Sequence, residues 1–184
     1  PPLEKIQLYC EQSSAHFDWL VEQGVPYSQQ MSPGMTVPQA GESLYFSGCE
    51  LAWPARELAV PAPRGHVPVA TGMTGGRVLM EALLAQATAA GVRLQAEVSG
   101  QRLTVTGDGR VIGMQVSVAG ETRTIRAYRG VVLASGGYIH NRDMVRNYAP
   151  ELYDCSVPWG NVGDQGMGIN MGIGAGAAAL RMHQ

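Results

Sequence analysis

Arg64 and His66 are two polar residues close together in a stretch, 25–70, that seven prolines interrupt. Their guanidinium and imidazole groups could contact an anion or a carbonyl group, which makes both residues candidates for catalysis. The alternative is that Arg64 pairs locally and that His66 is simply packed. The residues alone favour this alternative, because single arginine and histidine residues are common in loops.

Asp164 opens a Gly- and Met-rich segment, about 165–175, whose pattern predicts a helix. Its carboxylate has two possible roles. It could cap the helix, or it could accept hydrogen bonds from a bound polar group. Spacing alone favours the cap, because aspartate is a preferred residue at the position before a helix.

A run of small residues, Ala134, Ser135, Gly136 and Gly137, follows the apolar residues 131–133. The apolar residues predict a short strand buried on both faces. In an open α/β sheet, ligands bind where such strands end. Neighbouring glycines can also adopt positive φ and expose N–H groups, which suits a phosphate or a flat polar ring. The pattern therefore predicts a place where a ligand approaches the backbone.

The remaining sequence predicts the elements that would position these residues. Apolar periodicity predicts amphipathic helices over 3–23, 77–90 and 141–148. The prolines leave little room for regular structure in 25–70. Short alternating runs predict an antiparallel meander between residues 92 and 127, with strands over 92–98, 102–106, 111–118 and 122–127. The glycine-rich entry at 71–76 could hold an anion at a helix N-terminus, but it is not a P-loop.

Composition and charge limit the class of protein. The chain has 184 residues, 45% of them hydrophobic and 15% charged, which is typical of one globular domain or two small ones. A net charge of −2 gives no basic patch, so nucleic acid is not an expected partner. No apolar run is long enough for a membrane span. Three separated cysteines, Cys10, Cys49 and Cys155, fit neither a disulfide framework nor a metal site and favour a cytoplasmic location.

Several segments, taken in order, carry a family resemblance. They are 47–51 (SGCEL), 62–68 (APRGHVP), 108–114 (DGRVIGM), 131–138 (VVLASGGY) and 163–169 (GDQGMGI). Together they resemble the FAD-dependent flavoproteins related to fumarate reductase, succinate dehydrogenase and 3-ketosteroid dehydrogenase. The first two segments resemble the ketosteroid dehydrogenase branch. Ser135 stands where that family usually has threonine.

This resemblance implies a fold of the α/β class with α+β elements. It corresponds to the central part of an FAD-binding Rossmann-like domain that carries an antiparallel β-meander, together with part of a cap or substrate domain. Residues 1–70 would belong to the cap, and residues 71–184 would form an incomplete FAD-binding domain.

FAD is the cofactor that the resemblance implies. Glu97 and Val98 would lie beside the adenine, and Asp164 near the flavin or its linker. The small residues would let the dinucleotide pass close to the backbone, namely Ala134, Ser135, Gly136 and Gly137. The loop 25–70 would face the substrate, which brings Arg64 and His66 forward as candidates.

The activity implied is hydride exchange with a C–C bond next to a carbonyl, in a small molecule such as a ketosteroid. However, the sequence lacks the Gly-x-Gly-x-x-Gly fingerprint that holds the ADP part of FAD. We therefore expect a central fragment that binds FAD weakly or not at all and is inactive alone. The alternative is a non-catalytic interaction domain or one partner of a split flavoprotein. Self-association, or pairing with a complementing FAD-binding segment, is expected in either case.

Overall fold

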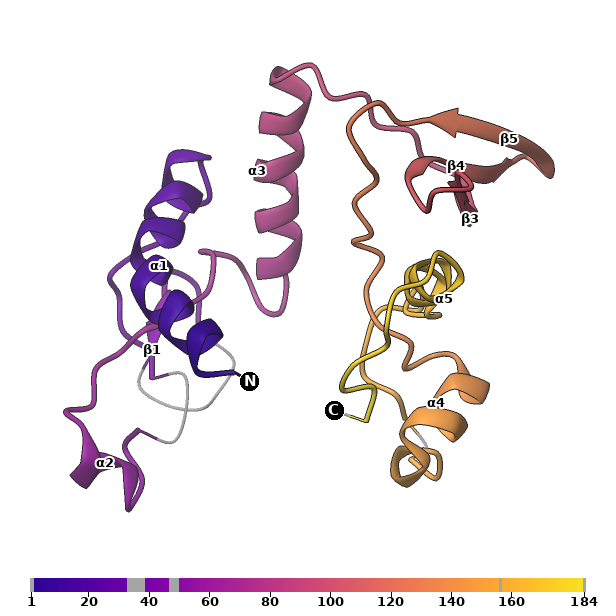
Figure 1. Ribbon diagram of the computed structural model, residues 1–184. Helices are drawn as coiled ribbons and strands as arrows, with labels where there is room; N and C mark the ends of the chain where they lie inside the picture. The colour runs from indigo at the N-terminus through magenta and orange to yellow at the C-terminus, as the bar shows by residue number, and fades with distance from the viewer. Residues whose placement is uncertain (1, 33–38, 47–49, 156, 184) are drawn as a thin grey trace. The chain divides into compact units, whose positions relative to one another are not determined.

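The computed structural model describes residues 2–32, 39–46, 50–155 and 157–183 (Figure 1). It divides into two compact units, Pro1–Leu94 and Gln95–Gln184. The predicted domains, 1–70 and 71–184, stay a prediction. Cys49 lies outside the described residues, and Cys10 and Cys155 are exposed free thiols.

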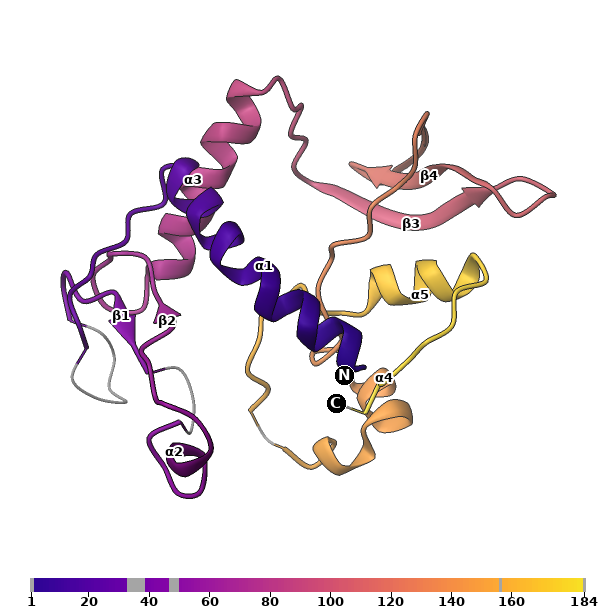
Figure 2. The same cartoon turned by 60° about the vertical axis from the view of Figure 1, so that its left-hand side comes forward.

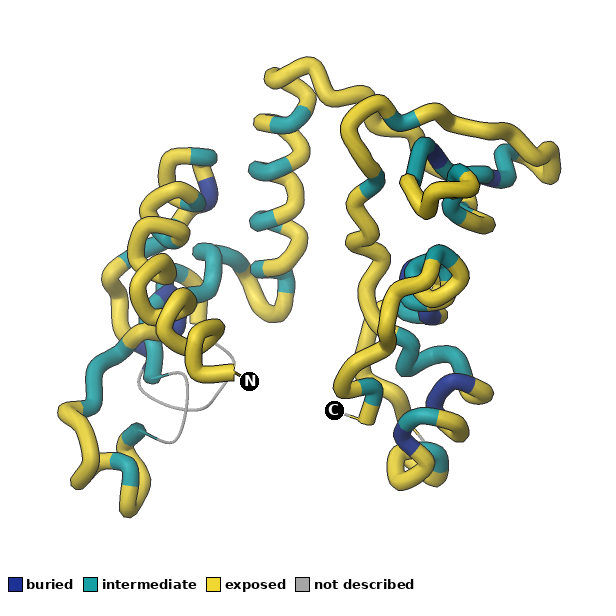
Figure 3. The backbone as a smooth tube through the Cα atoms, viewed as in Figure 1, coloured by how far each residue is buried: buried dark blue, intermediate teal, exposed yellow. Residues whose placement is uncertain are grey.

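The first unit begins with helix α1, Leu3–Glu22, as the apolar periodicity predicts. The helix ends because Gly24 adopts a φ of +87°, and its amide donates to the carbonyl of Val21 at 2.9 Å. Only the last part of α1 is packed, through the ring of Phe17, while most of the helix is exposed (Figure 3).

The proline-interrupted stretch contains only short elements in its described part. Strands β1, Leu44–Tyr45, and β2, Gly65–His66, pair antiparallel, and helix α2 covers Ala55–Leu58. Ser43 is fully buried beside this pair, and its carbonyl accepts a hydrogen bond from the amide of Val67 at 2.9 Å. These contacts hold the loop in place without a large apolar core.

Helix α3, Gly75–Ala89, closes the first unit (Figure 2). It begins two residues before the predicted start. Gly91 follows it with a φ of +79°, the left-handed conformation that commonly ends a helix. The prediction of this helix from residues 77–90 is therefore confirmed.

The second unit contains the predicted antiparallel meander. Strands β3, Val98–Val105, β4, Val111–Val118, and β5, Glu121–Arg126, lie side by side in that order. Gly109 supplies a φ of +85° at the turn between β3 and β4. Val116 of the central strand is 1% exposed, which places the small core of this unit at the sheet.

Helix α5, Met167–Gly174, packs against β3. A Cβ at Gly100 of β3 would lie 3.1 Å from the Cε of Met171, so the glycine leaves room for this side chain. A Cβ at Gly172 would lie 3.7 Å from the Cδ1 of Leu133. The helix therefore lies between the sheet and the segment that contains Leu133.

Helix α4, Arg142–Tyr148, and a 3₁₀-helix, Pro150–Leu152, complete the unit. The side chain of Asn141 accepts a hydrogen bond from the amide of Met144 at 3.1 Å, which confirms the predicted cap. Met144 and Val145 are buried.

Two strand predictions are wrong. Residues 92–97 form no strand, and β3 begins only at Val98. Residues 131–133 form no strand and are not buried, since Val132 is 90% exposed. A buried parallel strand needs neighbours that pair with its backbone on both sides. Within the described parts of the chain, no strand pairs with residues 131–133.

Candidate functional site

The small-residue run is an exposed segment of irregular backbone, anchored to the start of α5. The hydroxyl of Ser135 accepts a hydrogen bond from the amide of Gly168 at 3.1 Å. A Cβ at Gly168 would lie 2.2 Å from this hydroxyl oxygen, so the close approach depends on glycine. One side of the segment is thus fixed against α5, while its residues stay accessible.

Asp164 fixes the glycine pair that follows Ser135. One carboxylate oxygen accepts a hydrogen bond from the amide of Gly137 at 3.2 Å, and the other accepts one from the amide of Asn161 at 3.1 Å. Gly136 has a φ of +78°, and a Cβ there would lie 2.1 Å from Oδ1 of Asp164. The carboxylate therefore joins two loops.

The favoured prediction that Asp164 caps the helix is wrong. The residue before α5 is Gly166, with a φ of +75°. A Cβ at Gly166 would lie 2.2 Å from the Sδ of Met144, so buried packing against α4 and an αL backbone both favour glycine there. Asp164 is left two residues earlier, where backbone amides of the loops reach it.

The segment keeps an open side. Among the described residues, the amides of residues 131–136 donate no hydrogen bond. A Cβ built on Gly137 meets nothing within 4 Å. Exposed N–H groups and an empty space beside glycine are features that suit a phosphate or a flat polar ring. The residues present therefore fit a dinucleotide lying along the backbone.

The two other predicted cofactor residues stand just before and at the start of β3. Glu97 is exposed with a φ of +57°, and Val98 pairs with Val118 of β4. In the part of the chain that the structure describes, neither residue is hydrogen-bonded to residues 134–137. Their place beside an adenine stays a prediction.

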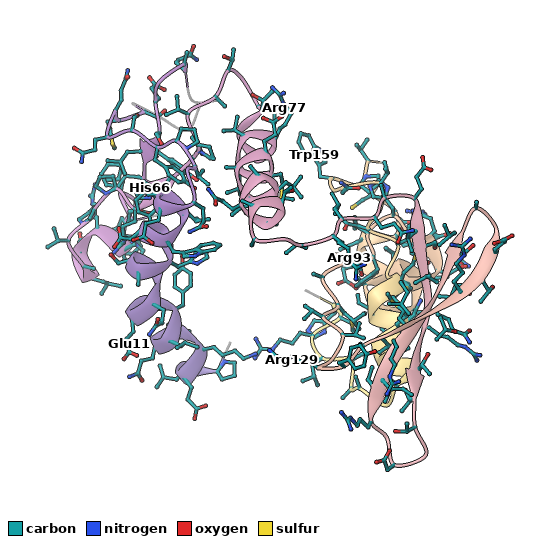
Figure 4. The ribbon with its side chains drawn as sticks, turned by 90° about the horizontal axis from the view of Figure 1, so that it is seen from above. Glu11, His66, Arg77, Arg93, Arg129 and Trp159 are labelled. Atoms are coloured by element: carbon teal, nitrogen blue, oxygen red, sulfur yellow. The ribbon has the colours of Figure 1, made fainter. Side chains whose placement is uncertain are left out.

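His66 is packed within the first unit (Figure 4). Its ring centroid lies 4.1 Å from that of Phe17 and 6.1 Å from that of Tyr27, and its Nδ1 lies 3.1 Å from the carbonyl oxygen of Arg64. Burial raises the pKa of the Tyr27 hydroxyl. Arg64 itself is exposed. In the described structure, the contact between the two candidates is thus local, between the His66 ring and the Arg64 carbonyl, and their catalytic role stays a prediction.

The glycine-rich entry to α3 borders a cavity of about 310 Å³. Val67, Pro68 and Met73 give it apolar walls, and Gly75 and Gly76 form part of its lining. Glu42 is its acidic residue. The apolar lining suits an uncharged group better than the anion that the entry alone suggests.

A family comparison identifies the family of this chain. A family model described as an FAD binding domain matches residues 2–184. The chain belongs to this FAD-binding domain family. Members of this family use FAD. The solved structures similar to this chain include ketosteroid dehydrogenases, so the family is one of flavin-dependent oxidoreductases. The resemblance inferred from the motifs is confirmed.

Similar proteins agree with this assignment. A 3-ketosteroid-Δ4-(5α)-dehydrogenase from Rhodococcus jostii RHA1, solved in complex with 4-androstene-3,17-dione, is 37% identical with a TM-score of 0.89 and covers 98% of this chain. A flavocytochrome c3 fumarate reductase in its open conformation is 24% identical with a TM-score of 0.68 over 91% of this chain, which shows the fold alone. A vinyl phenol reductase from Lactiplantibacillus plantarum is 28% identical over 171 residues, 92% of this chain.

This member of the FAD-binding domain family covers only part of the length of each of these proteins. The matches span 38% of the Rhodococcus enzyme, 25% of the fumarate reductase and 29% of the vinyl phenol reductase. Among the helices in the described ranges, none combines the length and apolar character that crossing a membrane requires.

One polar cluster was missed by the sequence analysis. The guanidinium of Arg146 donates a hydrogen bond to the hydroxyl of Tyr153, and the guanidinium carbon of Arg142 lies 4.0 Å from the centre of the same ring. These arginines hold the pKa of the Tyr153 hydroxyl below its usual value, chiefly through the Arg146 hydrogen bond. The sequence signal for this cluster was the spacing of the two arginines, which stand four residues apart on a predicted helix.

Proposed function

We propose that this chain is part of an FAD-dependent oxidoreductase that acts on a C–C bond next to a carbonyl group, as in a ketosteroid. The family assignment supports the cofactor, and the 37% identity to an enzyme solved with 4-androstene-3,17-dione supports the substrate class. The observation that carries the proposal is the open backbone of residues 134–137, fixed from behind by Gly168 and Asp164.

In this proposal the backbone of residues 134–137 lies along the dinucleotide. The chemistry that bound FAD supplies is hydride exchange with the substrate. Ser135 and Asp164 position the segment, since their polar atoms already accept hydrogen bonds from backbone amides. Glu97 and Val98 lie beside the adenine, and Arg64 and His66 belong to the substrate-facing side, with 1–70 as part of the cap and 71–184 as the incomplete FAD-binding domain.

The chain alone should hold FAD weakly and be inactive, because its sequence has no Gly-x-Gly-x-x-Gly fingerprint for the pyrophosphate. Its exposed apolar side chains support self-association or a complementing segment. Within the second unit, Val132 is 90% exposed, Trp159 84% and Leu180 80%. Where such side chains form one contiguous patch, the surface is typical of sites that another chain covers.

The same exposure favours a second candidate function, in which the chain is a non-catalytic module or one partner of a split flavoprotein. Light scattering tests self-association, which is one part of this alternative. We expect a dimer or larger assembly for the purified chain, and a monodisperse monomer would contradict self-association.

FAD titration by calorimetry and by visible absorption tests the main proposal. We expect weak, saturable binding that Gly137→Leu abolishes, because the leucine would fill the space that the dinucleotide needs. Gly107→Leu is the matched control, since a Cβ at Gly107 also meets nothing within 4 Å. Equal FAD affinity for both variants would contradict the site. Tight, stoichiometric FAD in the purified chain would contradict the weak binding.

A further inference from the structure

The second unit contains a cavity of about 480 Å³ beside α4, which the FAD proposal does not use. Its polar lining comes from His140, Arg142, Tyr153 and Asp154. This volume falls within the range of small-molecule sites. None of these residues belongs to segment 134–137, so the cavity has to be explained separately.

Arg142 brings a positive charge to this cavity, and Arg146, which does not line it, stands close by on the same helix. Arg142 and Arg146 stand one turn apart on α4, where like charges destabilise a helix. Their guanidinium carbons lie 4.0 and 4.5 Å from the centre of the Tyr153 ring. In the described part of the chain, neither arginine forms an ion pair with a carboxylate. The Arg142 guanidinium is therefore available to an anion in the cavity, while Arg146 is hydrogen-bonded to Tyr153 and contributes its charge from beside it.

His140 adds an unused polar atom. Its Nε2 is buried and has no hydrogen-bond partner among the described residues, although the residue lines the cavity. Its backbone is fixed, since its amide donates to the carbonyl of Asp164 at 3.0 Å. Buried polar atoms in native proteins almost always have a partner.

Tyr153 reports the local potential. Its hydroxyl accepts a hydrogen bond from Arg146, and its pKa is lowered by that bond, by the charge of Arg146 and by Arg142. The surroundings therefore favour a negative oxygen at this position. Asp154 is the acidic residue of the lining and would repel a second negative group. The cavity thus suits a ligand with one anionic end.

We propose that this cavity binds the oxyanion group of a small molecule, a phosphate or a carboxylate, through Arg142, with Arg146 adding positive charge close by. The Arg142 guanidinium offers charge-assisted hydrogen bonds, and such bonds to oxyanions are about twice as strong as neutral ones. The tyrosine ring holds both guanidinium groups at its faces and so limits their motion.

Inorganic phosphate and acetate are the two probes, each titrated calorimetrically into the full chain against chloride at equal ionic strength. The probe that binds with the higher affinity identifies the kind of oxyanion. Arg142→Gln should weaken the binding by about tenfold or more, as the loss of a charge-assisted hydrogen bond predicts. Arg129→Gln removes an exposed arginine of the same unit outside the cavity and should leave binding unchanged (Figure 4).

A second measurement needs no arginine variant. Bound phosphate would offset the positive charge and move the tyrosinate absorbance of Tyr153 to higher pH, and Tyr153→Phe would remove that signal. The absence of both phosphate and acetate binding would overturn the proposal. An equal loss of affinity in Arg142→Gln and Arg129→Gln would also overturn the proposal, because such a result would show that the anion is attracted by net charge alone.

Discussion

The hydroxyl of Ser135 occupies the position that a Cβ at residue 168 would need, and it accepts a hydrogen bond from the Gly168 amide at 3.1 Å. This contact joins the exposed segment to the first turn of α5. Because the segment has no strand partner in the described ranges, such contacts decide where its backbone lies.

Gly168→Ala and Gly172→Ala should differ in their effect on the free energy of unfolding. Alanine at either helical position gains about 0.5–1 kcal/mol from the lower entropy of the unfolded chain. At Gly172 the new Cβ meets only ordinary contacts, so we expect a net gain. At Gly168 it must displace the Ser135 hydroxyl, which loses a hydrogen bond of about 1 kcal/mol. Urea unfolding measures both.

The double variant Ser135→Ala with Gly168→Ala is the control for that contact. With no hydroxyl to displace, alanine at 168 should be tolerated better than in the Ser135 background. If Gly168→Ala stabilises the wild-type chain as much as Gly172→Ala does, the hydroxyl does not restrict the helix.

Gly136→Ala should destabilise the chain, whereas Gly137→Ala should not. Alanine at 136 would have to keep a φ of +78° and would push against the carboxylate of Asp164. An unfavourable backbone conformation of this kind costs about 1–3 kcal/mol. A Cβ at Gly137 meets open space, so its effect should stay within about 0.5 kcal/mol. Equal unfolding free energies for the two variants would contradict the role given to Asp164.

Asn141 should contribute to the stability of the folded chain through two separate hydrogen bonds. Its side-chain oxygen accepts a hydrogen bond from the Met144 amide at 3.1 Å, and its side-chain nitrogen donates to the Gln165 carbonyl at 2.9 Å. Asn141→Ala loses both and should cost about 1 kcal/mol or more. Asn141→Ser keeps a cap and loses only the hydrogen bond to Gln165, so its thermal stability should lie between those of the wild type and Asn141→Ala. A serine variant as unstable as alanine would assign the effect to this hydrogen bond.

Stability should rise with pH through the ionisation of Tyr153. Its folded pKa is lowered, so the folded chain releases the phenolic proton at a lower pH than the unfolded chain does. The contribution is complete above the unfolded pKa of about 10 and is lost as the pH falls through the folded pKa. Arg146→Gln should raise this pKa in a spectrophotometric titration, and Arg142→Gln should raise it less. An unchanged titration in Arg146→Gln would contradict the cause.

Local patterns explain why much of the fold could be predicted. The spacing of apolar residues and the glycines at 24 and 91 locate α1 and α3, because helix formation and termination depend on nearby residues. The hairpin turn at Gly109 and the cap at Asn141 are local in the same way. The order of motifs, which is also read along the chain, was enough to predict the family.

The candidate site could be predicted only in part. The small-residue run was found because glycine at 136 and 137 is unusual beside an apolar segment. The role of Asp164 was not found, because its partners at Gly137 and Asn161 depend on how two loops meet. The arginine pair around Tyr153 was also missed, since the ring and the helix come together only in the folded chain.

The sequence by itself therefore determined helices α1, α3, α4 and α5, the antiparallel meander and the family, whose signals lie within short windows. Only the tertiary structure decided that residues 131–137 are exposed and that their glycines fit against Asp164 and α5. Burial and strand pairing are properties of partners distant in sequence, and a run such as Val-Val-Leu has the same local pattern whether or not those partners are present. The run first interpreted as a buried strand is in this chain an exposed backbone, anchored on one side and open on the other.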